Sequence, residues 1–367
     1  MSLKENFAES NSQTLELLIK KLMKGLTGIV DDGTYSFEAN GEVVDDKSWN
    51  AWNWPQGVAL YGLYKYGKKQ GDAEAARIIS DWYQPYLQSV FADKNINSMA
   101  PILTLACLYE DSGNPELIPH LEDWAKWSME TLSKTAFAGF QHDTFGVTNH
   151  QQLWDDTLMM SVLALAKIGV LFANSEYLAE AERQFLVHCQ FLMDKQTGLW
   201  YHGWTFAGKH NFSNVFWARG NCWITIAIPE FISIMGEKLS LSVKNYLIDV
   251  LNAQIDGLVK YQNPEGLWHT VLDDPTSYVE TSAGFGFVYG IEKGVSMGIV
   301  SDDRLVHSTR AFEQLLSFIT SEGQVKNVSA GTPMGETKQF YKDIPITDMP
   351  YGPSLAILAL GEKLSEE

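Results

Sequence analysis

The stretch Trp154-Asp-Asp-Thr-Leu-Met-Met-Ser-Val-Leu-Ala-Leu-Ala-Lys-Ile-Gly169 decides the fold class, because an aromatic residue and two acids open a long apolar run. Leu158, Val162, Leu165 and Ile168 follow helical spacing, and the positions one residue after the first three are apolar as well. Apolar side chains therefore cover most of the circumference, as in a helix that is buried on all sides. We predict an inner helix with its polar start at a rim.

Five further segments repeat this pattern, each with aromatic or polar residues first and small, apolar ones after: Trp54–Tyr66, Asn97–Tyr109, Trp217–Met235, Tyr278–Met297 and Tyr351–Leu360. Amphipathic stretches alternate with them, such as Ser12–Leu26, Asp72–Phe91 and Leu239–Tyr261. Recurring helix pairs bury a continuous core only by stacking on their neighbours. The order predicts an all-α fold, an (α/α)6 barrel of six inner and six outer helices, with residues 1–367 as a single domain.

The composition excludes several classes of partner. The 367 residues carry a formal net charge of −18, so we expect no nucleic-acid partner, and an anionic ligand would need local cations at its site. The longest apolar stretches, such as Met159–Val170, are too short to span a membrane, so no membrane association is expected. Cys107, Cys189 and Cys222 all fall in helical patterns, which favours reduced thiols and a cytoplasmic location.

A short motif recurs in the loops before three inner segments: a glycine, an apolar residue and then a histidine two or three residues on. It places His142, His202 and His269 near the same rim. The alternative is that these loops are structural hairpins whose histidines are hydrogen-bonded for packing. There is no His-x-x-x-His, no Cys-x-x-Cys, no phosphate loop and no dinucleotide fingerprint, so no metal and no cofactor are expected.

Tryptophan is concentrated at the same rim. Nine of the 12 tryptophans fall at inner-segment starts or in rim loops, and only Trp82, Trp124 and Trp127 fall in outer segments. Flat aromatic faces with an N–H group suit sugar rings, which stack through C–H faces and form hydrogen bonds at their edges. Filling of a barrel mouth is the alternative, but packing alone predicts no such bias, so a carbohydrate ligand is favoured.

Two polar clusters are the candidates for chemistry. Asp155 and Asp156 are successive helical positions about 100° apart, so one should face the cavity and the other should cap the helix or pair with a neighbour; alternatively, both are N-terminal charges favoured by the helix dipole. Arg219, in Trp217–Trp223, begins a buried segment and so needs a partner or a ligand. With Lys209 and His210 it would supply positive charge for an anionic sugar, or it forms an ion pair with a rim acid.

Three motifs, taken in order, resemble glycoside hydrolase family 105, the unsaturated rhamnogalacturonyl hydrolases, which is related to the unsaturated glucuronyl hydrolases of family 88. They are Gln152–Met160, Thr197–Trp204 and Trp217–Trp223. The likeness extends to Trp54–Val58, Gly266–His269, Tyr278–Thr281 and Pro345–Gly352.

The resemblance implies an (α/α)6 barrel that acts on products of polysaccharide lyases, in this case an unsaturated rhamnogalacturonan disaccharide. Such products end in a 4-deoxy-hex-4-enuronic acid with a C4=C5 double bond and a carboxylate. In the family, one Asp protonates C4 and water adds at C5. The resulting hemiketal opens and releases the neighbouring sugar.

Residue by residue, the resemblance makes Asp156, which precedes Thr-Leu, the catalytic acid. It implies that substrate is bound by Trp54, Asn97, His142, His202, Trp217, Arg219 and Trp223. Many members carry an Asp at the start of the second inner helix, where this chain has Asn97, so a second carboxylate is missing at that position.

Other functions fit the same barrel, because a fold does not fix its chemistry. An epimerase would rely on a pair of the rim histidines, and an ordinary glycosidase would need two carboxylates. A non-catalytic sugar-binding scaffold would need neither. Both galacturonate- and glucuronate-derived substrates are compatible with the motifs.

Overall fold

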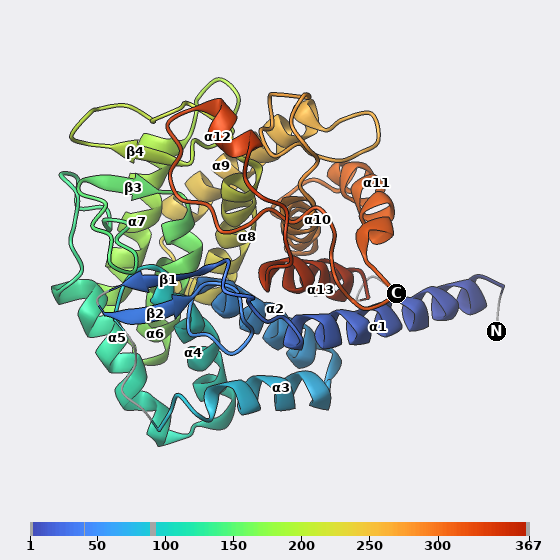
Figure 1. The fold of residues 1–367 in the computed structure, drawn as a ribbon, viewed down its shortest axis with the longest axis horizontal. Helices are drawn as coiled ribbons and strands as arrows, with labels where there is room; N and C mark the ends of the chain where they lie inside the picture. Colours follow the sequence, from blue (N-terminus) through green and yellow to red (C-terminus); the bar gives the residue numbers. More distant parts are fainter. Residues whose placement is uncertain (1–2, 40, 89–92, 365–367) are drawn as a thin grey trace.

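The inner ring of the barrel is closed. The computed structural model describes residues 3–39, 41–88 and 93–364 (Figure 1). Its inner helices are α2 (Trp54–Gln70), α4 (Ala100–Ser112), α6 (Leu163–Leu171), α8 (Ala218–Met235), α10 (Thr281–Ser296) and α13 (Tyr351–Lys363). Each packs against the next in this order, and α13 packs against α2. The prediction of an all-α (α/α)6 barrel is confirmed.

An outer helix packs on each inner helix. The outer helices are α1 (Leu3–Thr27), α3 (Ala73–Tyr83), α5 (Ile118–Glu130), α7 (Ser175–Leu192), α9 (Leu241–Tyr261) and α11 (Leu305–Leu315). Helix α1 lies against α13, and each of the others lies against the inner helix that precedes or follows it in the chain. The predicted outer stretch Asp72–Phe91 is helical only as far as Tyr83, and residues 89–91 lie outside the described ranges. The extent of the domain, 1–367, stays a prediction.

The inner and outer helices differ in burial as their sequences predict. Every residue from Leu163 to Gly169 of α6 is buried, whereas α9 buries one stripe that includes Leu247, Leu251 and Leu258. The inner helices also approach closely. At Gly290 of α10 an added Cβ would lie 2.3 Å from the backbone oxygen of Thr225 in α8, so only glycine allows this contact.

The starts of three inner helices differ from prediction. Trp154 lies in strand β3 (Gln152–Trp154), which pairs with β4 (Gly203–Thr205), and the helix begins at a π-helical turn, Leu158–Val162. Asn97 lies in a 3-10 turn before α4, and α10 begins only at Thr281. Three-residue strands and single turns satisfy the backbone at the rim, so the aromatic and polar starts of these segments are not helical.

A hairpin precedes the first inner helix. It consists of β1 (Ser36–Ala39) and β2 (Glu42–Asp45), and it lies beside α2 in Figure 1. Asn53, the residue directly before α2, caps this helix, since its side chain accepts a hydrogen bond from the backbone N–H of Trp54.

Across the described ranges, no helix is both long and apolar enough to cross a membrane. The three cysteines are buried and free, as predicted. A cytoplasmic location stays a prediction.

Candidate active site

A cavity of about 240 Å³ opens among the starts of the inner helices. Five of the eight predicted site residues line it: Trp54, Asn97, His142, Asp156 and Trp217. Further lining residues come from the hairpin and from two loops: Phe37, Asp46, Asn53, Thr144, Phe145, Trp154, Gly331, Thr332 and Pro333. The structure therefore brings the starts of several inner segments together at one mouth.

A larger cavity, of about 530 Å³, lies at the opposite ends of the inner helices. Four of its five lysines are paired with acids; for example, Lys65 Nζ lies 3.1 Å from a carboxylate oxygen of Glu230, and Lys69 Nζ lies 2.7 Å from one of Glu362. None of the predicted site residues lines this cavity. We therefore assign the chemistry to the smaller cavity.

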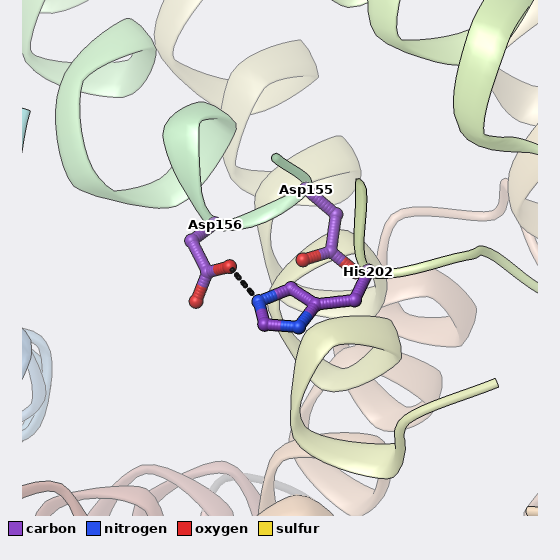
Figure 2. A group of neighbouring side chains, drawn as sticks. All are labelled: Asp155, Asp156 and His202. Atoms are coloured by element: carbon purple, nitrogen blue, oxygen red, sulfur yellow. Dashed lines mark hydrogen bonds and ion pairs between the residues drawn. The ribbon is translucent and has the colours of Figure 1, made fainter. Parts of the chain in front are cut away.

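Asp156 faces the cavity and is held from behind by His202 (Figure 2). His202 Nε2 lies 3.1 Å from Asp156 Oδ2, and His202 Nδ1 lies 2.7 Å from the hydroxyl oxygen of Tyr341. The backbone N–H of Gly335 donates to that same oxygen at 3.1 Å. With Asp156 ionised, one direction satisfies every group: Gly335 donates to Tyr341, Tyr341 to Nδ1, and Nε2–H to Asp156.

This chain of hydrogen bonds sets the charge of Asp156. Burial raises the pKa of its carboxyl, but the hydrogen bond from His202 lowers it, and the net effect is a pKa below the ordinary value of an aspartate. Asp156 is therefore a carboxylate in the free protein. His202 itself is almost completely buried and does not line the cavity, so its contact is with Asp156.

Asp155 is the buried partner of Asp156. Its side chain is fully buried, and neither carboxyl oxygen has a hydrogen-bond partner among the described residues. Burial, together with the negative charge of Asp156, raises the pKa of Asp155 well above its ordinary value, so Asp155 holds a proton. Gly220 of α8 makes room for it, because an added Cβ there would lie 2.3 Å from Asp155 Oδ2.

The expectation that the two acids face different ways agrees with this arrangement. Asp155 lies directly before the helical residues Asp156 and Thr157, but its carboxyl oxygens accept no hydrogen bond from the described residues. One ligand atom each of Asp155, Asp156 and His202 lies within 4.8 Å of the others, which a metal ion could in principle bridge (Figure 2). A metal ion at this position would require Asp155 to lose its proton, because metal ligands must be deprotonated. The absence of a metal from the reaction stays a prediction.

We expect Asp155→Asn to keep kcat within about tenfold of wild type, because a neutral amide replaces a neutral acid that transfers no proton to substrate. Steady-state kinetics with a thermal unfolding control measure this. A loss as large as that of Asp156→Asn would instead make Asp155 the proton donor.

His142 forms one wall of the cavity. Its ring stacks on Trp154 at a centroid distance of 4.3 Å and an angle of 10°, and its Nδ1 lies 2.8 Å from Thr157 Oγ1. Burial lowers the pKa of His142 to about 3, so the ring is neutral. The third rim histidine, His269, donates to the backbone oxygen of Ser277 and does not line the cavity, as expected for a structural hairpin.

Arg219 lies behind the cavity wall and is completely buried. One terminal nitrogen donates to both oxygens of Ser329, the backbone one at 2.9 Å, and the other donates at 2.7 Å to the backbone oxygen of Ala330 and to Thr332 Oγ1. Glu280 lies 3.6 Å away. This geometry favours the ion-pair alternative over direct contact with a substrate carboxylate, because the terminal nitrogens of the guanidinium are already used.

The other two predicted cations and Trp223 also lie away from the cavity. Lys209 and His210 are exposed and do not line the cavity. Trp223 is fully buried and meets Trp54 edge-on at 6.1 Å, so it supports that ring. Trp217 does line the cavity, whereas its Nε1 is buried and has no hydrogen-bond partner among the described residues.

Sequence reasoning missed Asp46, Asn53 and the loop from Gly331 to Pro333. Asn53 directly precedes the Trp54 motif, and this position could have indicated that it lies at the site. Asp46 follows a short polar hairpin, and the loop meets Arg219 about 110 positions along the chain, so neither carries a local pattern.

Comparison with known proteins gives the family. Residues 30–365 match Glycosyl Hydrolase Family 88. The chain is 27% identical over 322 residues to the unsaturated rhamnogalacturonyl hydrolase YesR of Bacillus subtilis, which covers 86% of this chain and 90% of the relative. It is 28% identical over 218 residues to an unsaturated 3S-rhamnoglycuronyl hydrolase of an Alteromonas species, 58% of this chain and 51% of that one.

A solved structure of a possible member of the GH105 family, from Salmonella enterica serovar Paratyphi A, superimposes with a TM-score of 0.94 at 46% identity. The match covers 97% of this chain and 94% of the other. The protein is therefore a glycoside hydrolase, and the chain belongs to Glycosyl Hydrolase Family 88.

Proposed function

We propose that the protein releases the unsaturated uronic acid residue from a lyase-produced disaccharide, by hydration of the C4=C5 double bond. The observation that carries this proposal is that Asp156 lines the cavity while a hydrogen bond to His202 holds its carboxylate in place. The named relatives act on unsaturated rhamnogalacturonyl and rhamnoglycuronyl compounds, which supports an unsaturated rhamnogalacturonan disaccharide as the substrate here.

The cavity suits one terminal sugar. Its volume of about 240 Å³ lies slightly below the range of ~300–1,000 Å³ typical of ligand pockets. Trp54, Trp154 and Trp217 offer aromatic side chains against which a sugar ring can pack. A site of this size takes the end of a chain in preference to its middle.

Asp156 has to act first as an acid and then as a base. It is ionised in the free protein, but binding brings the substrate carboxylate close and displaces water, and both effects raise the pKa of Asp156 so that it takes up a proton. It then donates that proton to C4. Water adds at C5 and returns a proton to the carboxylate, while Nε2–H of His202 keeps the side chain in place.

Direct glycosidic hydrolysis is the second candidate, because the cavity contains another acid. Such a route needs two carboxyl groups on either side of the glycosidic bond. Asp46 lines the cavity together with Asp156, so the missing acid at Asn97 does not by itself remove this route. The epimerase alternative loses support, since both ring nitrogens of His202 and Nδ1 of His142 already have partners.

The position of solvent oxygen in the product distinguishes the two routes. In heavy-oxygen water we expect the label at C5 of the released uronic acid and solvent hydrogen at C4, with loss of the enol-ether absorbance. A saturated uronyl disaccharide with the same linkage should remain intact. Label at the anomeric carbon before exchange, or cleavage of the saturated analogue, would establish direct hydrolysis. Unchanged absorbance would indicate an epimerase or a binding protein.

A further inference from the structure

A second acid, Asp46, lies at the end of the hairpin and lines the same cavity as Asp156. Its backbone N–H donates to the backbone oxygen of Tyr35 at 3.2 Å, so the hairpin fixes its main chain. Its Oδ1 accepts a hydrogen bond of 2.6 Å from Nδ2 of Asn53. The side-chain oxygen of Asn53 is itself held at 2.8 Å by the backbone N–H of Trp54 at the start of α2.

The two carboxyl oxygens of Asp46 are therefore not equivalent. Oδ1 is anchored to the first inner helix, whereas no described residue donates to Oδ2. Gly331 lies beside Oδ2, and an added Cβ at that position would lie 2.6 Å from it, so only a residue without a side chain leaves space next to this oxygen. One anchored oxygen and one open acceptor beside Trp54 form an arrangement suited to a hydroxyl group on the edge of a stacked sugar.

The charges around Asp46 indicate which part of the sugar it meets. Burial and the neighbouring Asp45 raise its pKa to about 7, Asp31 adds to the effect, and the buried Arg219 opposes it. No lysine or arginine lines the cavity in the described part of the chain. An acid in this setting repels the substrate carboxylate, so it faces the uncharged hydroxyl edge of the ring.

We propose that Asp46 is a substrate-binding residue that accepts a hydrogen bond from a ring hydroxyl group of the terminal uronic sugar. This inference rests on the proposed function and adds to it a contact that selects sugars by hydroxyl position. Asp46 thereby acts in recognition, and proton transfer stays with Asp156.

The test compares Asp46→Asn with a matched control, Asp45→Asn. Asp45 Oδ1 accepts from the backbone N–H groups of Lys47 and Ser48, and an asparagine oxygen can keep both bonds while the same negative charge is lost. We expect kinetics at pH 8, where Asp46 is ionised, to show a KM about 10- to 100-fold higher for Asp46→Asn and little change in kcat. A loss of this size corresponds to one hydrogen bond to a charged group. Asp45→Asn should match wild type.

Deoxygenated substrates identify the partner of Asp46. Unsaturated disaccharides lacking the 2- or the 3-hydroxyl group of the uronic ring should bind Asp156→Asn less tightly by calorimetry. For one of the two analogues, the loss should disappear when Asp46→Asn is added. The inference would be overturned if both analogues lost as much affinity with Asp46→Asn as without it, or if Asp46→Asn left KM unchanged, provided that the wild-type protein turns over the substrate. Absence of wild-type turnover would overturn the proposed function instead, and absence of any binding would overturn both.

Discussion

Asp156→Asn is expected to lower kcat for the unsaturated disaccharide by about 10²–10⁴-fold, the usual contribution of a general acid–base group. Asparagine has the shape of aspartate but neither gives a proton to C4 nor takes one from water. Its amide oxygen can still accept from Nε2–H of His202, so the chain from Gly335 to the cavity is kept. Binding of the substrate and the unfolding temperature should therefore change little.

Single-turnover kinetics and calorimetry on the same preparation separate the chemical step from binding. Asp155→Asn is the matched control, because it changes the neighbouring acid, which is buried and does not line the cavity. If Asp156→Asn, shown to be free of wild-type protein, kept more than about a tenth of the activity, the assignment of the acid would be wrong.

Arg219→Met is expected to lower the free energy of unfolding by about 3–5 kcal/mol, because removing one member of a buried ion pair leaves the other charge unpaired. The residue left behind is Glu280, which is completely buried. The same change removes the donors that hold Ser329, Ala330 and Thr332, so the loop that forms one wall of the cavity loses its anchor.

Denaturant unfolding with and without the disaccharide tests this role. A structural Arg219 predicts the same loss in both conditions, whereas a ligand for the substrate carboxylate predicts a larger loss when the disaccharide is present. Arg219→Lys is the companion variant, since it keeps the charge but cannot reproduce the fork of donors. It should recover part of the lost stability. If both variants had normal stability but bound the disaccharide more weakly, the result would show that Arg219 contacts the substrate directly.

Much of the fold follows from local sequence pattern. The inner helices are apolar around most of their circumference and the outer ones on one stripe, and both patterns repeat every few residues, as in α6 and α9. Six alternations of the two then leave few ways to bury every apolar face. The strand pairing of Trp154 with Gly203 is only three residues long, and it joins segments about fifty positions apart, so no periodicity reveals it.

The site was predictable to a smaller extent. Asp156, His142 and Trp217 lie in motifs that the resemblance identified, and the structure places them around one cavity. The roles of Arg219 and Asp46 depend on which loop or hairpin lies beside them. Arg219 meets Ser329 across 110 positions, and that pairing is a product of tertiary structure alone.

The closure of the inner ring by α13 also constrains how the chain reaches its native state. Helix α13 is the last barrel helix to leave the ribosome, yet it packs against α2, α10 and α1. Until α13 is synthesised, the apolar faces of α2 and α10 that it covers have no neighbour. Nascent chains therefore expose apolar surface for most of their synthesis. Contacts between segments so far apart in sequence form late and favour slow folding and aggregation of incomplete chains. We therefore expect the circular architecture to leave incomplete chains prone to aggregation until α13 has been made.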